Sequence, residues 1–486
     1  MNTIKSAAVI KAVNLDQEIQ TPQFIMIKKI LLIFSISYLH FHHDSLAQTI
    51  AGGSLHSMSI CSDSTVMSWG RNQNGQLGIG NNLNSNVPLP VNSLTRITAI
   101  AACGDHSLAL KNDSTVWAWG LNQYGELGNG NNSNSNIPVQ VNSLTGVIAI
   151  ATGFNHCLAL KVDGTVWAWG RNIEGQLGNG NNTDSNIPVQ VNNLTGIIAL
   201  SAGEFHSIAL KNDSTVFTWG GNTLGQLGNG NFTSTNFPNI ISSLNGITAI
   251  SCGNAHSIAL KSDSTIYTWG YNAYGQLGNG NSTDSNIPLQ INSITQITSI
   301  SGGWYHTLVI RSDSTIWSWG YNLDGELGNG NNVNSNIPVQ VNSISGALKI
   351  SGGGQHSLCI KDDGTGWAWG WNYYGELGFG NNLDTNVPSQ INGMCTPLTN
   401  INSEVKNNLG ISIFPNPSSV TTTISFSNYL EKGNLELYNL FGELIFSNNF
   451  SGNEVEIDVE SLSSGIYFLK LSSSQKTLSI QKIIIE

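Results

Sequence analysis

Apolar and polar positions repeat along the chain with a period of 50 residues, from about Gln48 to Cys395, without insertion or deletion. Each unit contains short alternating apolar stretches separated by Gly, Asn and Asp, a pattern typical of β-strands joined by turns. In the second unit this pattern predicts four strands, over Ile97–Ala102, His106–Leu110, Thr115–Trp119 and Pro138–Val141. A repeat of this length predicts the blades of a propeller or the units of a solenoid.

The alternation also predicts which side chains meet between units, since successive residues of a strand point to opposite faces. Trp117 and Trp119 share one face of their strand, and Leu108 and Leu110 share one face of the preceding strand. We expect each sheet to have a bulky face and a small face, and to stack bulky against small. Seven units that stack in this way predict a closed ring with few exposed sheet edges.

Every unit places a histidine at the start of its second strand. The seven are His56, His106, His156, His206, His256, His306 and His356. They fall in line with leucines that should be buried between the sheets, where an imidazole needs hydrogen-bond partners. Zinc requires three or four ligands that converge on one point, and histidines separated by whole sheets do not converge. We therefore predict that these histidines are structural, and we expect no metal site and no cofactor.

The first 47 residues are expected to form an upstream extension and an export signal. Met26-Ile27-Lys28-Lys29 precedes an apolar run from Ile30 to Phe41, and Ser45-Leu46-Ala47 then offers a cleavage site. This order is typical of a secretory signal peptide, so Met26 is the expected start and residues 1–25 an extension. The apolar run is too short to span a bilayer stably. Export implies a compartment in which disulfides form.

Charge narrows the range of partners. Only 10% of residues are charged, and the formal net charge is −11. Since an acidic surface repels phosphate backbones, nucleic acid is not an expected partner. A membrane is expected to be a partner only through surface anchoring of the exported protein.

Three motifs recur in the units and are complete at Gly153–Leu160, Asp163–Gly170 and Asn172–Gly180. Together they resemble the repeats of the regulator of chromosome condensation family. The resemblance implies an all-β fold, a seven-bladed β-propeller of four-stranded blades over residues 48–395. It also suggests a nuclear exchange factor for a small GTPase, but an export signal, the acidic charge and the unbroken spacing disfavour that function.

The period ends at Cys395. Residues 396–409 are polar and are expected to form a linker, and the strand pattern of residues 410–486 predicts a small immunoglobulin-like β-sandwich. The blocks Ile413–Pro417, Leu437–Gly442 and Leu462–Leu471 resemble the C-terminal sorting domain of the type IX secretion system. The resemblance implies that the secretion machinery carries the protein across the outer membrane, to be released or held at the cell surface. A binding module of similar fold is the alternative.

The loops at one rim of the predicted ring differ between units, whereas those at the other rim are nearly uniform. Variable loops on a rigid scaffold suit recognition, and Tyr and Trp dominate binding hot spots. The last three units carry eight aromatic residues at this first rim: Tyr271, Tyr274, Trp304, Tyr305, Tyr321, Trp371, Tyr373 and Tyr374. We predict that they bind an extracellular protein or glycan. The alternative is that these rings only cover the ends of the blades.

Three function classes therefore compete. A secreted or cell-surface binding module is favoured. An extracellular carbohydrate-active enzyme would need an asymmetric acid and base, for which Glu174, Glu204 and Asp324 are carboxylates unique to their units. The exchange factor is the third class, and it is disfavoured.

Two cysteines depart from the repeat consensus. Cys61 and Cys395 should lie on the second rim, in the first and last blades, which ring closure brings together. The six cysteines allow 15 pairings, and a disulfide between Cys61 and Cys395 is one candidate among them. Cys157 and Cys359 occupy small positions on their strands and are expected to be plain packing residues.

Overall fold

The computed structural model describes residues 49–91, 93–395, 411–414, 420–438, 444–460, 462–463, 465–473 and 476–485. The predicted signal peptide and the predicted linker lie outside these residues. Over the described ranges every regular element is a strand. In the part of the chain that the structure describes, no helix could cross a membrane.

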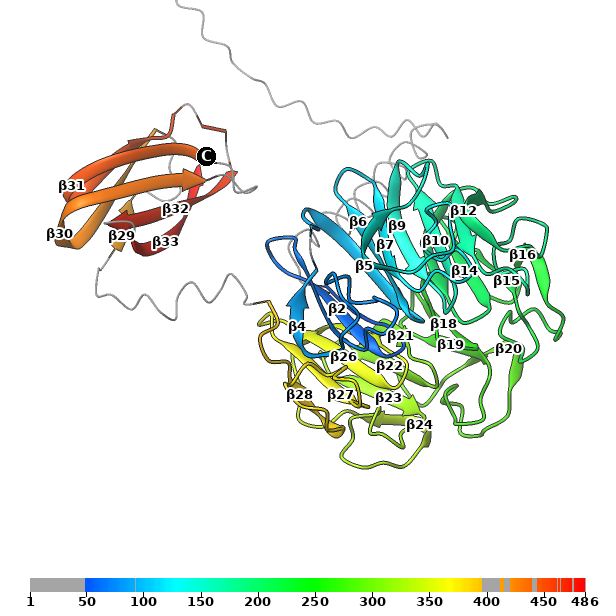
Figure 1. Ribbon diagram of the computed structural model, residues 1–486. Helices are drawn as coiled ribbons and strands as arrows, with labels where there is room; N and C mark the ends of the chain where they lie inside the picture. The colour runs from blue at the N-terminus through cyan, green and yellow to red at the C-terminus, as the bar shows by residue number, and fades with distance from the viewer. Residues whose placement is uncertain are drawn as a thin grey trace, which may run out of the picture. The chain divides into compact units, whose positions relative to one another are not determined.

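Seven four-stranded antiparallel sheets follow one another along the chain and are arranged in a ring (Figure 1). Blade 1 contains β1 (Thr49–Gly52), β2 (His56–Ile60), β3 (Val66–Gly70) and β4 (Ser85–Pro90). Blade 2 contains β5 (Ile97–Cys103), β6 (His106–Lys111), β7 (Val116–Gly120) and β8 (Ser135–Gln140). Blade 3 contains β9 (Val147–Thr152), β10 (His156–Lys161), β11 (Val166–Gly170) and β12 (Ser185–Gln190).

The remaining blades repeat this order. Blade 4 contains β13 (Ile197–Ala202), β14 (His206–Lys211), β15 (Val216–Gly220) and β16 (Thr235–Ile240). Blade 5 contains β17 (Ile247–Cys252), β18 (His256–Lys261), β19 (Ile266–Gly270) and β20 (Ser285–Gln290). Blade 6 contains β21 (Ile297–Gly302), β22 (His306–Arg311), β23 (Ile316–Gly320) and β24 (Ser335–Gln340). Blade 7 contains β25 (Ala347–Gly352), β26 (His356–Lys361), β27 (Gly366–Gly370) and β28 (Thr385–Gln390).

The first strand of each blade lies nearest the axis, because it contacts the first strands of the neighbouring blades. These contacts join β1, β5, β9, β13, β17, β21 and β25 in that order, and β25 contacts β1. The predicted all-β fold of seven four-stranded blades is therefore confirmed. The fourth strand of blade 2 begins at Ser135 rather than at Pro138, because Ser135 still pairs with Gly120 beyond a bulge.

The predicted division of each sheet into a bulky face and a small face is wrong. In blade 2, Leu108 lies opposite Ala118, and Trp119 lies opposite Ser107. Since directly opposed residues of an antiparallel pair share a face, each face has large residues on one strand beside small residues on the next. Adjacent blades interlock through this mixture: Trp169 of blade 3 fits against Leu108 and Ala118 of blade 2.

The C-terminal region forms a single five-stranded sheet. Its strands are β29 (Ile411–Phe414), β30 (Thr421–Tyr438), β31 (Leu444–Asp458), β32 (Gly465–Ser473) and β33 (Lys476–Ile485). The order is β29-β30-β32-β33, and β31 also pairs with β30. Ile424, Leu437 and Ile483 are among the side chains that form its buried core. The predicted immunoglobulin-like sandwich of two sheets is not confirmed, because the long strand β30 joins all the pairings into one sheet.

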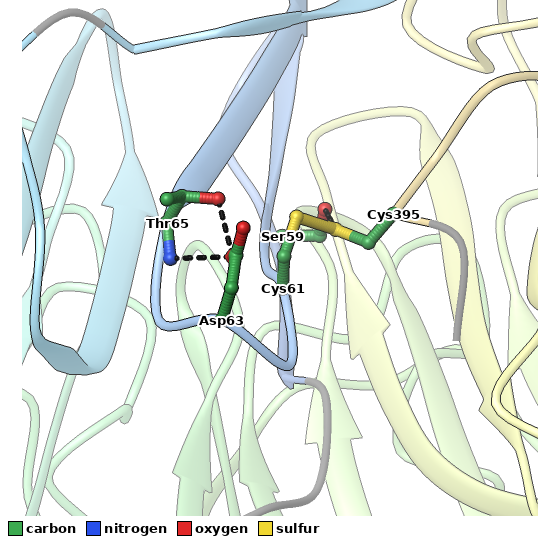
Figure 2. Close-up of a disulfide and its surroundings, with 5 residues drawn as sticks. All are labelled: Ser59, Cys61, Asp63, Thr65 and Cys395. Atoms are coloured by element: carbon green, nitrogen blue, oxygen red, sulfur yellow. Dashed lines mark hydrogen bonds between the residues drawn. A yellow bond between two sulfur atoms is a disulfide. The ribbon is translucent and has the colours of Figure 1, made fainter. Parts of the chain in front are cut away.

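The ring closes between blades 7 and 1 without exchange of a strand, since each blade is built from one continuous segment. On the second rim, Cys61 at the end of β2 and Cys395 after β28 form a disulfide that links residues 334 positions apart (Figure 2). The adjoining turn of blade 1 is held by Asp63, whose carboxylate accepts hydrogen bonds from the backbone amide and hydroxyl of Thr65 (Figure 2). This bond supplies the covalent connection that a shared strand would otherwise provide.

Loss of the disulfide should weaken the propeller. We expect the double variant C61S/C395S to lose about 2–4 kcal/mol of unfolding free energy, because its unfolded chain is no longer cross-linked. Denaturant titration followed by tryptophan fluorescence measures the difference. A reductant should bring the wild-type protein to the midpoint of the variant and leave the variant unchanged. A fully reduced wild-type protein with an unaltered midpoint would contradict the assignment.

Candidate functional site

The seven repeat histidines all lie between blades. Each is almost fully buried, with at most 1% of its surface exposed. Each Nε2 lies 2.8–3.2 Å from the hydroxyl or thiol at the second position of the next blade's second strand. The partners are Ser107, Cys157, Ser207, Ser257, Thr307, Ser357 and, across the ring closure, Ser57.

The hydrogen bonds continue to a backbone carbonyl and thereby define the tautomer. Ser107 Oγ donates to the carbonyl of Gln76 at 2.9 Å, and Trp119 Nε1 donates to the same oxygen at 2.8 Å. Because the serine hydrogen is used in this way, His56 Nε2 must donate to Ser107 Oγ, and its imidazole is neutral. Burial lowers the pKa of His56 to about 3 and that of His106 to about 4. The arrangement has neither the exposure nor the charge that a proton-transferring histidine needs.

Five of the eight predicted rim aromatics form one contiguous cluster, which we call the tyrosine cluster. It contains Tyr271 and Tyr274 of blade 5 and Trp304, Tyr305 and Tyr321 of blade 6. The ring centroids of Tyr274 lie 5.2 Å from Tyr305 and 5.1 Å from Tyr321. All five side chains are half-buried. Burial, followed by the nearby Asp324 and Glu326 carboxyls, raises the pKa of Tyr321 to about 12, so its hydroxyl stays a hydrogen-bond donor at neutral pH.

The other three predicted aromatics gather at the seam between blades 7 and 1. Tyr373 lies 6.0 Å from Trp371 and 4.9 Å from Tyr374, and its side chain is 64% exposed. The Arg71 guanidinium stacks over Tyr374 at 5.6 Å and forms an ion pair with Asp105 at 3.2 Å. The structure thus brings the predicted residues together in two groups rather than in one patch.

The three carboxylates unique to their blades have separate partners. Glu174 accepts a hydrogen bond from Ser234 Oγ at 3.1 Å. Burial raises the pKa of Glu204, and a hydrogen bond with Asn254 opposes that shift. Burial and the neighbouring Asp384 raise the pKa of Asp324. Each of these contacts joins a single unique carboxylate to other side chains, so the described contacts do not assemble the acid and base of a glycosidase.

Three repeat-position glutamates are buried where the other blades have glutamine. Glu126, Glu326 and Glu376 occupy the position of Gln76, and none of their side chains is exposed. Burial raises the pKa of Glu126 to about 7 and those of Glu326 and Glu376 to about 8. One carboxyl oxygen each of Glu326 and Glu376 is buried without a hydrogen-bond partner among the described residues. These groups are carboxylic acids at mildly acidic pH, and ionise as the pH rises.

An axial cavity of about 270 Å³ opens between the first strands of all seven blades. Five of the loop residues that lie two positions before a repeat histidine line this cavity, and we call the full set of seven equivalent residues the collar. They are Ser54, Gly104, Phe154, Glu204, Asn254, Trp304 and Gly354. Backbone hydrogen bonds join neighbours in the collar, for example from the amide of Glu204 to the carbonyl of Asn254 at 2.7 Å. The collar therefore has a backbone tied to the neighbouring blades and side chains that vary.

Sequence reasoning selected Trp304 for the aromatic patch and Glu204 as a carboxylate unique to its unit, but it did not group the seven collar positions as one site. The available signal was that six residue types occupy this position in seven units, while the histidine two residues later does not change. The strand pattern alone does not place the loop over an axial cavity, since that requires the curvature of the closed ring. Within the described residues, no group of three or more His, Cys, Asp or Glu side chains could hold a metal ion.

Family models match almost the whole propeller. An RCC1-like domain matches residues 35–245, and the regulator of chromosome condensation (RCC1) repeat matches 263–310, 313–360 and 363–398. A second model of the same repeat matches 247–276, 297–326 and 348–376. The secretion system C-terminal sorting domain matches residues 412–486.

Solved structures share the fold. Human WBSCR16 is 25% identical with a TM-score of 0.59, over 64% of this chain and 85% of that chain. Prp20p from Saccharomyces cerevisiae is 24% identical with a TM-score of 0.62, over 76% of this chain and 90% of that chain. A search of curated proteins finds no match to this chain.

The hydrogen bonds between blades predict a selective loss of stability. We expect S207A to lower the free energy of unfolding by about 1–3 kcal/mol, because it leaves His156 Nε2 buried without its partner and removes one of the two hydrogen bonds to the Gln176 carbonyl. The matched variant C157S should be neutral or stabilising, since it restores the serine that most other blades have. Thermal unfolding at pH 7 compares the two. Equal losses in both variants would contradict the role of the hydroxyl.

The buried glutamates predict a loss of stability at alkaline pH. A carboxyl whose pKa is higher in the folded than in the unfolded state stabilises the fold when protonated, and this contribution is lost between the two values. For Glu326 the window runs from 4.5 to about 8. We expect E326Q/E376Q to be at least about 1 kcal/mol more stable than wild type at pH 9 and closer to it at pH 5. Denaturant titrations at both pH values test this, and a pH-independent difference would refute it.

Proposed function

We propose that this chain, which belongs to the regulator of chromosome condensation repeat family, is an exported propeller that binds an extracellular protein or glycan. The chain also ends in a secretion system sorting domain. The sorting domain implies delivery by the type IX secretion machinery to the cell surface or the surroundings. Its match covers residues 412–486, so the propeller is the part that remains to carry the binding function.

The observation that carries this proposal is the tyrosine cluster. Its five rings come from two neighbouring blades and three separate loops, and adjacent centroids lie 5.1–6.4 Å apart. Their half-buried state packs part of each ring against its neighbours and leaves part of each side chain accessible. Rigid amphipathic rings of this kind lose little conformational entropy on binding, which is why Tyr and Trp supply so much interface energy.

The scaffold beneath the cluster supports a binding role rather than catalysis. In our interpretation the seven histidines are structural, because each is a neutral buried donor to the next blade. A carbohydrate-active enzyme is the second candidate, and Glu204 at the axial cavity is the carboxylate best placed for it. We favour binding because Glu204 has an amide as its hydrogen-bonding neighbour rather than a second unique carboxylate. Exchange-factor activity has no support beyond the shared fold.

The tyrosine cluster should be required for capture of the partner. We expect Y305A/Y321A in the mature exported protein to reduce binding to glycan arrays or to cross-linked surface proteins by tenfold or more, since hot-spot truncations cost about 2 kcal/mol or more. The control is F232A, which removes an aromatic ring that is 53% exposed outside both aromatic groups.

A second variant, W371A/Y373A, tests whether the group at the seam of blades 7 and 1 contributes to the same surface. Circular dichroism and thermal unfolding show whether each variant is folded. Unchanged capture by folded Y305A/Y321A would refute the proposal that this cluster binds the partner.

A further inference from the structure

The axial cavity has a chemically distinct wall. Four consecutive blades place Phe154, Glu204, Asn254 and Trp304 around one side of the collar, and all four side chains are half-buried. Phe154 and Trp304 come from blades 3 and 6, and their ring centroids lie only 5.8 Å apart. The other side of the collar is completed by residues with small side chains. Two aromatic rings, one carboxylate and the Asn254 amide therefore stand together at the mouth of a channel that is otherwise lined by Ile, Ala, Ser, Thr, Cys and Gly residues.

The walls below the collar offer few free polar groups. Alanine lines this region in blades 1 to 3, at Ala51, Ala101 and Ala151. In blades 4 to 7 the equivalent residue is serine, and its hydroxyl already accepts a backbone amide of the next blade. The measured bonds join Ser201 to Cys252, Ser251 to Gly302, Ser301 to Gly352 and Ser351 to Gly52 at 2.9–3.1 Å. An aliphatic chain fits such a wall better than a ring of hydroxyl groups does.

We propose that the collar is a binding site for a primary alkylammonium group, such as a lysine side chain or an amine-bearing small molecule. The Glu204 carboxylate and the Asn254 amide oxygen would receive the ammonium hydrogens. The faces of Trp304 and Phe154 would stabilise the cation, and the alkyl stem would lie along the alanine side of the channel. None of the residues that line the cavity is basic, and Arg171, which acts on Glu204, lies outside the lining.

A sugar is the competing ligand, because aromatic rings and carboxylates also bind carbohydrates. A pyranose presents hydroxyl groups around its whole edge, and each loses a water hydrogen bond if the wall does not replace it. Of the collar side chains only Ser54, Glu204 and Asn254 are polar, and each serine below already accepts a backbone amide, which leaves it only its hydroxyl hydrogen. The ammonium needs few partners and one negative charge, which this wall supplies.

The site goes beyond the proposed function, because it would persist even if the tyrosine cluster bound nothing. The test titrates the full mature protein with n-butylammonium at pH 8 and follows binding by calorimetry. The matched neutral probe is n-butanol, and methyl glucoside is the sugar probe. We expect n-butylammonium to bind more tightly than both. We expect E204Q to weaken it about tenfold, since a charge-assisted hydrogen bond contributes about 1.5–3 kcal/mol.

Two variants separate this site from its surroundings. E174Q removes a rim carboxylate of blade 3 that lies outside the cavity lining, and it should leave amine binding unchanged. Y274A/Y321A disrupts the tyrosine cluster without touching the collar, and it should also leave amine binding unchanged. The proposal is overturned if n-butylammonium does not bind, if folded E204Q binds it as tightly as wild type, or if methyl glucoside binds more tightly.

Discussion

One buried backbone carbonyl in each blade holds the next blade in place. The oxygen of Gln76, or of its equivalent in the other six blades, accepts both the indole N–H and the hydroxyl or thiol of the following blade. The hydroxyl in turn accepts the histidine of the blade before it, so four groups form one hydrogen-bonded chain. Because all of these atoms are removed from water, leaving any one of them unpaired is costly. This requirement explains why every blade presents the same donors to the same acceptor.

The use of a backbone atom explains how the first rim can vary. A carbonyl accepts the same two hydrogen bonds whether its residue is Gln76 or Glu126. The same loop is stiffened from within by a buried asparagine, as where Asn122 accepts the Leu127 amide and donates to two carbonyls. Side chains that point outward from this frame, such as Tyr274 and Tyr321, can therefore change without disturbing the contact between blades. Because the acceptor between blades is a backbone atom, the interior of the ring is uniform while the side chains of the first rim vary.

Much of the fold could be predicted from the sequence because it depends on local patterns. Alternation along each strand and turn residues such as Asn112-Asp113 locate the strands, and the fixed period predicts identical blades. The pairing between strands could not be predicted in this way. Placing Leu108 and Trp119 on opposite faces depends on the register of the hairpin, which a shift of one residue would invert. The single C-terminal sheet escaped prediction for a similar reason, since long strands such as β30 do not reveal where one pairing partner replaces another.

The candidate sites also have a part that could be predicted from the sequence and a part that could not. The rim aromatics could be found by comparing repeats, because their positions are exposed in any propeller. Their separation into two groups could not be predicted, because the contact between Tyr274 and Tyr305 depends on the conformations of two loops from different blades. The collar depends on contacts between residues that are still farther apart in the sequence. Phe154 and Trp304 are 150 positions apart in a chain of identical period, and only the curvature of a closed ring brings their rings within 5.8 Å. A property of the whole ring, rather than of any one blade, therefore brings side chains of two nonadjacent blades together, with their rings tilted by 45°.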